Sequence, residues 1–226
     1  MKIAGVNHNI EGVIFDMDGL LVNSEKLYWQ ANIQAAKEAG LDISEDSYVK
    51  LAGASVKKMT EFYNKYFPTP QARDAFIKRT DDLVAQWTKQ GKLKLQPGVQ
   101  AALDYFNKHQ IKMGIASSNY ESVIQENLWV TGIRQYFYFH LSYDDVLKSH
   151  LKSKPASDIY ELAKGKMGLP AENLVVFEDS STGVQAAKNA GLAVIMIPDL
   201  KEPSKKDQEN ATAIYSDFNQ VLQNTR

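Results

Sequence analysis

Four acidic residues directly follow apolar segments, with a spacing that could build a site for a metal ion and a phosphate group. Asp16 and Asp18 come after one such segment, and Glu178 and Asp179 come after another. If both segments are parallel strands, their carboxyl ends meet at one sheet edge, where ligands bind. Repulsion among four carboxylates would raise some of their pKa values unless a cation lay between them. Ligands that offer only oxygen favour a hard ion, and Mg²⁺ is the usual choice beside phosphate.

Two more groups suit phosphate chemistry. Ser117 and Ser118 follow a third apolar segment, and Lys154 precedes Pro155 in a loop. Each motif alone has an ordinary explanation. An Asp-x-Asp pair is often a turn or a helix cap, paired serines occur in turns, and a loop lysine is usually solvated. The recurrence of such residues at the ends of several predicted strands favours a shared site.

The elements that must position these residues alternate between strands and helices. The predicted strands are continuous apolar runs, which favours a parallel sheet covered by helices on both faces. We therefore expect an α/β fold, with a doubly wound, Rossmann-like core. The strongest predicted strands are 12–15, 111–116, 174–177 and 193–198, and weaker ones are 137–141 and 213–215.

Particular residues predict where two helices of this core begin and end. Pro97 fits the first position of a helix that runs to about His109, since its missing N–H is not needed there. A second helix begins after Ser180–Ser181 and ends at Gly191, which fits a left-handed C-terminal cap.

One long interval contains no convincing strand. From residue 24 to residue 92 the pattern has only the helical period, over 25–39, 55–67 and 71–90. We expect a small all-helical domain inserted after the first strand. The predicted division is therefore residues 1–22 and 93–226 for the α/β core, and residues 23–92 for the insertion.

Composition narrows the class of protein. The 226 residues carry 26 Lys and Arg against 27 Asp and Glu, a net charge of −1, which argues against binding nucleic acid through its phosphates. There is no cysteine, so disulfides and thiolate chemistry are excluded. The longest strongly apolar run, near 192–198, is too short to cross a bilayer. We expect a soluble, cytoplasmic monomer that binds a small molecule, with no nucleic-acid or membrane partner.

Four ordered motifs resemble the signatures of the haloacid dehalogenase superfamily. They are DMDGLLVNSE from residue 16, IASSN from 115, KPASDIY from 154 and FEDSSTG from 177. The resemblance spans nearly the whole chain. It is closest to the subgroup with a helical cap, which includes beta-phosphoglucomutase and small sugar-phosphate phosphatases.

The resemblance implies a role for each matched residue. Asp16 would be the nucleophile that forms an aspartyl-phosphate, and Asp18 would be the general acid and base. Ser117 and Lys154 would bind the phosphoryl group, with Lys154 neutralising its charge. Gly19 would allow the tight turn beside the phosphate, where Ser118 would also bind.

The same resemblance implies a Mg²⁺ cofactor. Its ligands would be the Asp16 carboxylate, the Asp18 backbone carbonyl, Asp179 and Glu178. The ion would let an anionic nucleophile approach an anionic phosphate.

Departures from the subgroup bear on the reaction. Tyr28 stands where beta-phosphoglucomutases carry a histidine, and Val56 stands where a basic residue is expected after the turn Gly53–Ser55. Both differences favour a phosphatase over a mutase. The spacer before Lys154 is longer than usual, so Lys148 and Lys152 compete for its role, but only Lys154 is followed by Pro155 and Asp158 as in the motif.

The expected activity is hydrolysis of a small phosphate monoester, such as a sugar or polyol phosphate. Beta-phosphoglucomutase activity is the alternative, and a non-catalytic protein that binds a phospho-ligand on the same fold is the second. The residues of the insertion that would contact the substrate are Tyr28, Gly53, Ser55 and Lys57.

Overall fold

A computed structural model describes residues 1–51 and 56–226, and the side chains of residues 52–58 lie outside that description. Six parallel strands form one sheet in the order β3-β2-β1-β4-β5-β6. The central strand β1 therefore lies between β2 and β4, where the direction of winding changes, and this is the switch point at which such sheets bind ligands. The strands are β1 (Gly12–Phe15), β2 (Lys112–Ala116), β3 (Phe139–Leu141), β4 (Leu174–Glu178), β5 (Ala193–Met196) and β6 (Ala213–Ile214).

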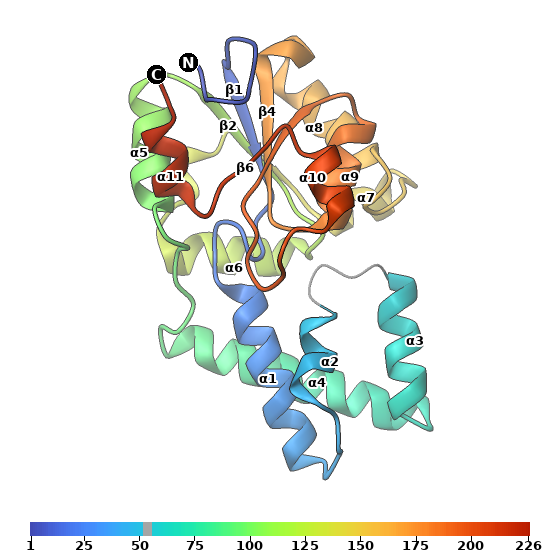
Figure 1. Ribbon diagram of the computed structural model, residues 1–226. Coiled ribbons are helices and arrows are strands. Elements are labelled where there is room, and N and C mark those ends of the chain that lie inside the picture. The colour runs from blue at the N-terminus through green and yellow to red at the C-terminus, as the bar shows by residue number, and fades with distance from the viewer. Residues whose placement is uncertain (52–55) are drawn as a thin grey trace.

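Helices cover both faces of the sheet. Successive residues of β1 point to opposite faces, so Phe15 packs into one apolar cluster and Ile14 into the other. The cluster around Phe15 is lined by α5 (Val99–Lys108), α6 (Glu121–Thr131) and α11 (Phe218–Gln223). The cluster around Ile14 is lined by α8 (Asp158–Met167) and α9 (Ser181–Asn189). The predicted α/β fold with a two-sided parallel sheet is confirmed (Figure 1).

Aromatic packing fixes the middle of the sheet. The ring of Phe15 stacks on that of Phe177 across the β1–β4 pair, with centroids 5.5 Å apart. The rings of Phe106 and Phe218 lie 6.2 Å and 6.0 Å from Phe15. Burying a side chain of this kind contributes about 1.5–3 kcal/mol. The packing therefore holds rigidly the two strand ends that carry the acidic residues.

Four helices follow β1 and form the helical insertion that the sequence predicts. In Figure 1 they lie together beyond the end of the sheet at which the strands finish. They have their own apolar cluster, which includes Ala31, Tyr48, Phe76 and Leu83. The helices are α1 (Ser24–Glu38), α2 (Glu45–Val49), α3 (Val56–Tyr66) and α4 (Pro70–Lys89).

The two chain segments that join the insertion to the sheet are hydrogen-bonded to each other. The Asn23 side chain accepts a bond from the Lys94 N–H at 2.8 Å and donates one to the Lys92 carbonyl at 3.3 Å. The Gln96 N–H donates to the Leu21 carbonyl at 3.0 Å. These bonds support the predicted division at 22/23 and 92/93, which stays a prediction.

One predicted helix start is wrong. The helix expected from Pro97 begins at Val99, and Gly98 precedes it with a φ of +80°. The Pro97 carbonyl instead accepts a bond from the Phe218 N–H, and a Cβ on Gly98 would lie 2.5 Å from the Asn219 nitrogen. The close approach of α11 therefore requires a glycine turn before α5.

The remaining helices and short segments connect the sheet. They are α7 (Tyr143–Lys148), α10 (Lys205–Asn210) and two 3₁₀ turns, Arg134–Tyr136 and Ala171–Asn173. Gly191 follows α9 with a φ of +71°, as its predicted cap role requires. Across the described ranges, no helix combines the length and apolar character needed to cross a membrane.

Candidate active site

The ends of three adjacent strands bring the predicted site residues together. Asp16 follows β1, Ser117 follows β2 and Glu178 is the last residue of β4. The Asp16 N–H donates to the Phe177 carbonyl at 3.0 Å, which continues the β1–β4 ladder past the end of β1. All three residues are buried. The expectation that parallel strands deliver these groups to one edge is confirmed.

Lys154 lies between the acidic residues. Its ammonium group is 2.6 Å from an Asp16 carboxylate oxygen and 2.6 Å from Oε1 of Glu178. It also donates to the Ala116 carbonyl at 3.0 Å. The competing Lys148 and Lys152 are exposed. Lys154 is therefore the lysine that contacts Asp16.

The fully buried Tyr160 of α8 completes this network. Its hydroxyl donates to Oε1 of Glu178 at 2.6 Å and accepts from the Lys154 ammonium at 3.1 Å. The ammonium also lies 4.8 Å from the centroid of the Tyr160 ring. Tyr160 belongs to the quoted motif KPASDIY, but sequence reasoning gave it no role.

Burial dominates the electrostatics of the site. It raises the pKa of the Asp16 carboxyl to about 7, assisted by the charges of Glu178 and Asp18 and opposed by Lys154. Burial also lowers the pKa of Lys154, but the charges of Asp16 and Glu178 more than compensate, so its net pKa lies well above the usual value. Lys154 is therefore a fixed positive charge beside Asp16.

Three carboxylates form a cluster that could hold a metal ion. Each of Asp16, Glu178 and Asp179 offers an oxygen, and these oxygens lie within 4.8 Å of one another. Burial and the charges of Asp16 and Glu178 raise the pKa of Asp179 well above its usual value. Among the described residues, the Lys154 ammonium pairs with Asp16 and Glu178, so three carboxylates share a single positive charge. A hard divalent cation fits this all-oxygen set and would relieve the repulsion.

Two glycines allow the acidic residues to pack so closely. A Cβ on Gly19 would lie 2.3 Å from Oδ2 of Asp179, and a Cβ on Gly183 would lie 1.8 Å from Oε1 of Glu178. Gly19 also has a φ of +79°, which L side chains rarely adopt. The predicted need for glycine at position 19 therefore has two causes, the turn and the approach of Asp179.

Asp18 is held by a different set of residues from Asp16. Its carboxylate accepts from the Ser24 hydroxyl at 2.8 Å and from the Ser117 hydroxyl at 3.2 Å. The Asn119 amide also donates to it, at 3.3 Å and 3.4 Å. Ser118 is exposed beside Ser117, where a ligand could reach it. Sequence reasoning missed Ser24 and Asn119, although both stand within motifs that it quoted.

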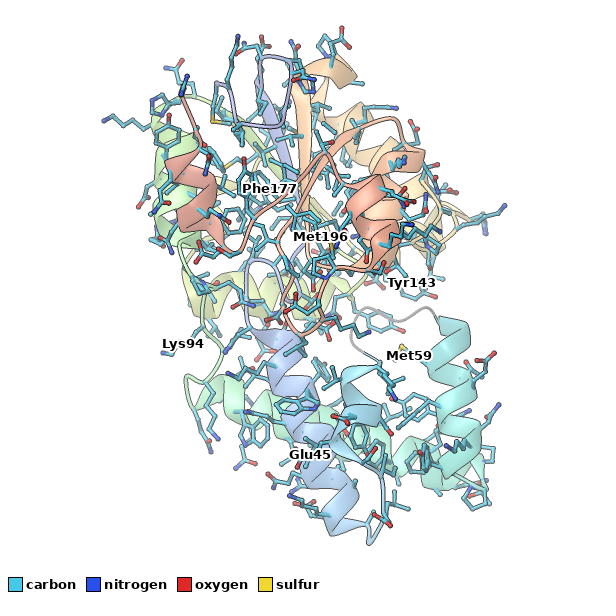
Figure 2. The ribbon with its side chains drawn as sticks, in the orientation of Figure 1. Glu45, Met59, Lys94, Tyr143, Phe177 and Met196 are labelled. Carbon is cyan, nitrogen blue, oxygen red and sulfur yellow. The ribbon has the colours of Figure 1, made fainter. Side chains whose placement is uncertain are left out.

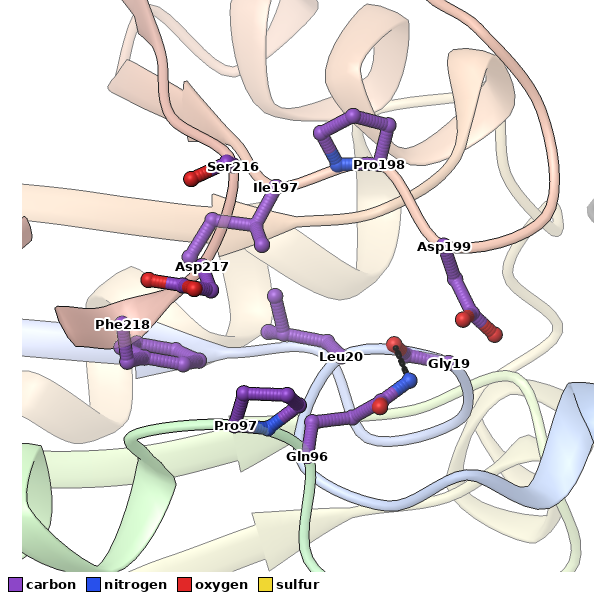
Figure 3. Close-up of a pocket in the computed structure, with 10 residues that line it drawn as sticks. All are labelled: Gly19, Leu20, Gln96, Pro97, Ile197, Pro198, Asp199, Ser216, Asp217 and Phe218. Atoms are coloured by element: carbon purple, nitrogen blue, oxygen red, sulfur yellow. Dashed lines mark hydrogen bonds between the residues drawn. The ribbon is translucent and has the colours of Figure 1, made fainter. Parts of the chain in front are cut away.

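Gln96 also stabilises the turn at Gly19. The Gln96 amide donates to the Gly19 carbonyl at 2.8 Å, and both residues line a pocket of about 170 Å³ (Figure 3). Asp199 also lines this pocket, and burial raises the pKa of its carboxyl, opposed by a hydrogen bond from the Gln96 side chain. Asp16, Asp18, Ser117 and Lys154 are not among its lining residues. The pocket therefore flanks the acidic site without containing it.

Glu25 is a further acidic residue that the sequence did not single out. It lies in the first turn of α1, where an acidic residue normally only favours the helix dipole. Burial raises its pKa to about 8, assisted by the charges of Asp18, Asp16 and Asp199. Its proximity to three carboxylates could be found only from the fold.

Four residues of the insertion are predicted to contact the substrate, and the structure describes the side chain of one of them, Tyr28. Tyr28 of α1 is half-buried, and burial together with the Asp81 carboxylate raises its pKa. The charges of Asp18 and Glu25 act in the same direction, so Tyr28 lies on the side of α1 near the acidic site. Gly53 and Ser55, and the side chain of Lys57, lie outside the described residues.

Comparison with known proteins settles the family. A family model described as haloacid dehalogenase-like hydrolase matches residues 13–197. The chain belongs to the haloacid dehalogenase-like hydrolases. The predicted membership and the prediction of a hydrolytic enzyme are thus confirmed.

Several relatives of this family resemble the chain over most of its length. A phosphorylated carbohydrates phosphatase from Thermotoga maritima is 31% identical over 183 residues, which is 81% of this chain and 82% of the relative. The structure of a candidate beta-phosphoglucomutase from Thermotoga maritima has a TM-score of 0.76 at 28% identity, covering 95% of this chain and 97% of its own. CbbY from Rhodobacter sphaeroides, in complex with phosphate, has a TM-score of 0.77 at 24% identity, covering 92% and 95%, and shares the fold.

Proposed function

We propose that the chain is a Mg²⁺-dependent phosphatase that hydrolyses small phosphate monoesters, with sugar or polyol phosphates as substrates. The observation that carries the proposal is the Lys154 ammonium, fixed 2.6 Å from Asp16 and 2.6 Å from Glu178 at the strand ends. A buried cation beside a carboxylate can bind a phosphoryl group at the point where the carboxylate attacks it.

In the first half-reaction an Asp16 carboxylate oxygen attacks phosphorus and the ester P–O bond breaks. The product is an aspartyl-phosphate on Asp16, and the alkoxide that leaves takes a proton from Asp18. Lys154 and the Ser117 hydroxyl stabilise the charge on the phosphoryl oxygens.

In the second half-reaction water attacks the phosphorus of the aspartyl-phosphate. Asp18 takes the proton of that water, and cleavage of the P–O bond to Asp16 restores the carboxylate. The bonds to Ser24, Ser117 and Asn119 hold the Asp18 carboxylate apart from the cluster of Asp16, Glu178 and Asp179. This separation supports different roles for the two aspartates.

The metal ion would be held by the carboxylates of Asp16, Asp179 and Glu178, together with the backbone carbonyl of Asp18. It would supply positive charge that lets an anionic nucleophile meet an anionic phosphate. The all-oxygen donor set and the raised pKa values of Asp16 and Asp179 support Mg²⁺ as the cofactor.

The proposed substrate class is supported by a relative of known name and by a residue of the insertion. One relative, 31% identical to this chain, is a phosphorylated carbohydrates phosphatase. The Tyr28 hydroxyl on α1 is hydrogen-bonded to the Asp81 carboxylate, and its oxygen could still accept a bond from a hydroxyl group of a sugar. The same tyrosine, in place of a histidine, favours hydrolysis over mutase activity.

A substrate panel tests this proposal. With Mg²⁺ present, we expect sugar and polyol phosphates to exceed nucleotides and phosphoglycolate by at least about tenfold in kcat/KM, or about 1.4 kcal/mol. EDTA should silence the enzyme and added Mg²⁺ should restore it. A lead for nucleotides or phosphoglycolate would contradict the substrate class. Conversion of beta-glucose 1-phosphate to glucose 6-phosphate with little free phosphate would establish a mutase, and no turnover at all would favour a binding protein.

The acidic cluster also predicts how stability depends on pH. In the metal-free protein the pKa values of Asp16 and Glu25 are about 7 and about 8, against ordinary values of 3.8 and 4.5. The native state therefore binds more protons than the unfolded chain between those limits, so the free energy of unfolding falls as pH rises. In EDTA, we expect Tm to be higher at pH 5.5 than at pH 8.

Magnesium should reverse this trend, because it binds the deprotonated carboxylates. Thermal unfolding with and without Mg²⁺ should give a larger increase in Tm at pH 8 than at pH 5.5. The Asp16→Asn variant, which lacks one titrating group, should show a flatter pH dependence in EDTA. A metal-free Tm that rises with pH over this window would contradict the raised pKa values.

A further inference from the structure

Two tyrosines form an aromatic pair on the surface of the core. Tyr120 caps the start of α6 and Tyr143 opens α7. Their ring centroids are 5.5 Å apart and their planes meet at 87°, an edge-to-face arrangement. Tyr120 is 54% exposed, so much of this side chain is open to a ligand.

Both tyrosines are tied to Asn119, which contacts Asp18. The Tyr143 N–H donates to the Asn119 carbonyl at 2.8 Å, and the Tyr120 N–H donates to the Asn119 side-chain oxygen at 2.9 Å. The amide nitrogen of the same side chain donates to the Asp18 carboxylate at 3.3 Å. The pair therefore adjoins the group that we propose to protonate the leaving alkoxide.

Tyr143 lies on the side of the core that faces the insertion, helices α1–α4. In Figure 2, Met59 of α3 is labelled opposite it. Met59 is 37% exposed. The organic part of a phosphate ester bound at Asp16 would thus lie near the aromatic pair.

The charges next to the pair are negative. Glu121 follows Tyr120 and Asp144 follows Tyr143, and the Glu121 N–H donates to the Asp144 carboxylate at 2.7 Å. The Glu121 carboxylate bonds His140 at 2.6 Å. A second phosphate group placed here would meet two carboxylates, whereas a neutral ring would not.

Building on the proposed phosphatase activity, we propose that Tyr120, supported by Tyr143, selects the leaving group by stacking on its C–H face. The favoured substrates are then monophosphates of ring-shaped sugars. Acyclic polyol phosphates offer less surface for stacking, and bisphosphates meet the charges of Glu121 and Asp144. Tyr120 is in this sense a specificity-determining residue.

The test compares kcat/KM for four substrates: glucose 6-phosphate, glycerol 3-phosphate, fructose 1,6-bisphosphate and acetyl phosphate. Acetyl phosphate has too small a leaving group to stack and reports on the core chemistry. We expect wild-type enzyme to prefer glucose 6-phosphate to the acyclic ester and the bisphosphate. Tyr120→Ala should lower the ratio of kcat/KM for glucose 6-phosphate to that for acetyl phosphate by about twofold to tenfold.

Two variants complete the test. Tyr120→Phe should retain the wild-type ratio, because stacking needs the ring and not the hydroxyl. Tyr138→Ala removes a tyrosine that is 72% exposed at the amino end of β3, away from the site, and should change neither rate. An unchanged ratio in Tyr120→Ala, or an equal loss for both substrates, would overturn the inference. Wild-type enzyme that hydrolyses none of the four would instead contradict the proposed function.

Discussion

Replacement of Asp16 by asparagine is expected to abolish turnover. The amide has nearly the shape of the carboxylate but is a very poor nucleophile, and it cannot form the aspartyl-phosphate. It also removes one of the three carboxylates that would hold the metal and the acidic partner of Lys154 at 2.6 Å. Losing a nucleophile costs several orders of magnitude, so we expect kcat to fall by at least about 10⁴-fold.

Phosphate release from a chromogenic ester measures this loss, and mass spectrometry of acid-quenched enzyme detects phosphate on the peptide that contains Asp16. Asp199→Asn is a control, since Asp199 is a half-buried acidic residue near the Gly19 turn that lies outside the cluster of Asp16, Glu178 and Asp179. That variant should turn over near the wild-type rate. Appreciable activity in Asp16→Asn, or a phosphorylated peptide from elsewhere in the chain, would show that another group attacks phosphorus.

The placement of Asp16, Ser117 and Glu178 was predictable from sequence because topology alone determines it. Each follows or closes a short apolar strand, and parallel strands end at one edge of a sheet. The packing of Phe15 on Phe177 keeps β1 and β4 in register, so their terminal acidic residues meet. The position of this site could therefore be predicted without knowing which distant residues contact each other.

Contacts between separate elements were not predictable in the same way. Tyr160 reaches Glu178 and Lys154 only because α8 packs against the sheet beside β2 and β4. Glu25 has an ordinary sequence context, and its raised pKa comes from its burial in the fold, assisted by the charges of Asp18, Asp16 and the distant Asp199. A sequence pattern gives the type of an element, whereas these properties depend on which elements touch.

Short elements and turns were also missed. The helix α2 has five residues, too few for a helical period to be recognised. Pro97 fitted a helix start in sequence, but the approach of Asn219 imposed a turn at Gly98. In both cases tertiary packing decided the local structure.

Replacement of Asp18 by asparagine is expected to slow both half-reactions without abolishing metal binding. General acid and base catalysis typically contributes about 10²–10⁴-fold, and asparagine can neither give nor take the proton. The metal contact proposed for Asp18 uses its backbone carbonyl, which the substitution keeps. The Ser24 hydroxyl, at 2.8 Å, can still donate to the amide oxygen. The amide NH2 group takes the place of the other oxygen and can donate to the Ser117 hydroxyl, now at 3.2 Å, so the side chain should stay in place.

The Asp18→Asn variant should differ from Asp16→Asn because it retains metal binding. The Mg²⁺-dependent increase in Tm should be close to that of wild-type enzyme, while kcat for a sugar phosphate falls by about 10²–10⁴-fold. Activated esters, whose leaving groups need no proton, should lose less in the first half-reaction, and acid quenching should trap phosphate on Asp16 because its hydrolysis is also slowed. Normal turnover with normal metal affinity would mean that another group moves the proton. The candidate nearest to hand would be Glu25, whose raised pKa of about 8 already suits it to hold one.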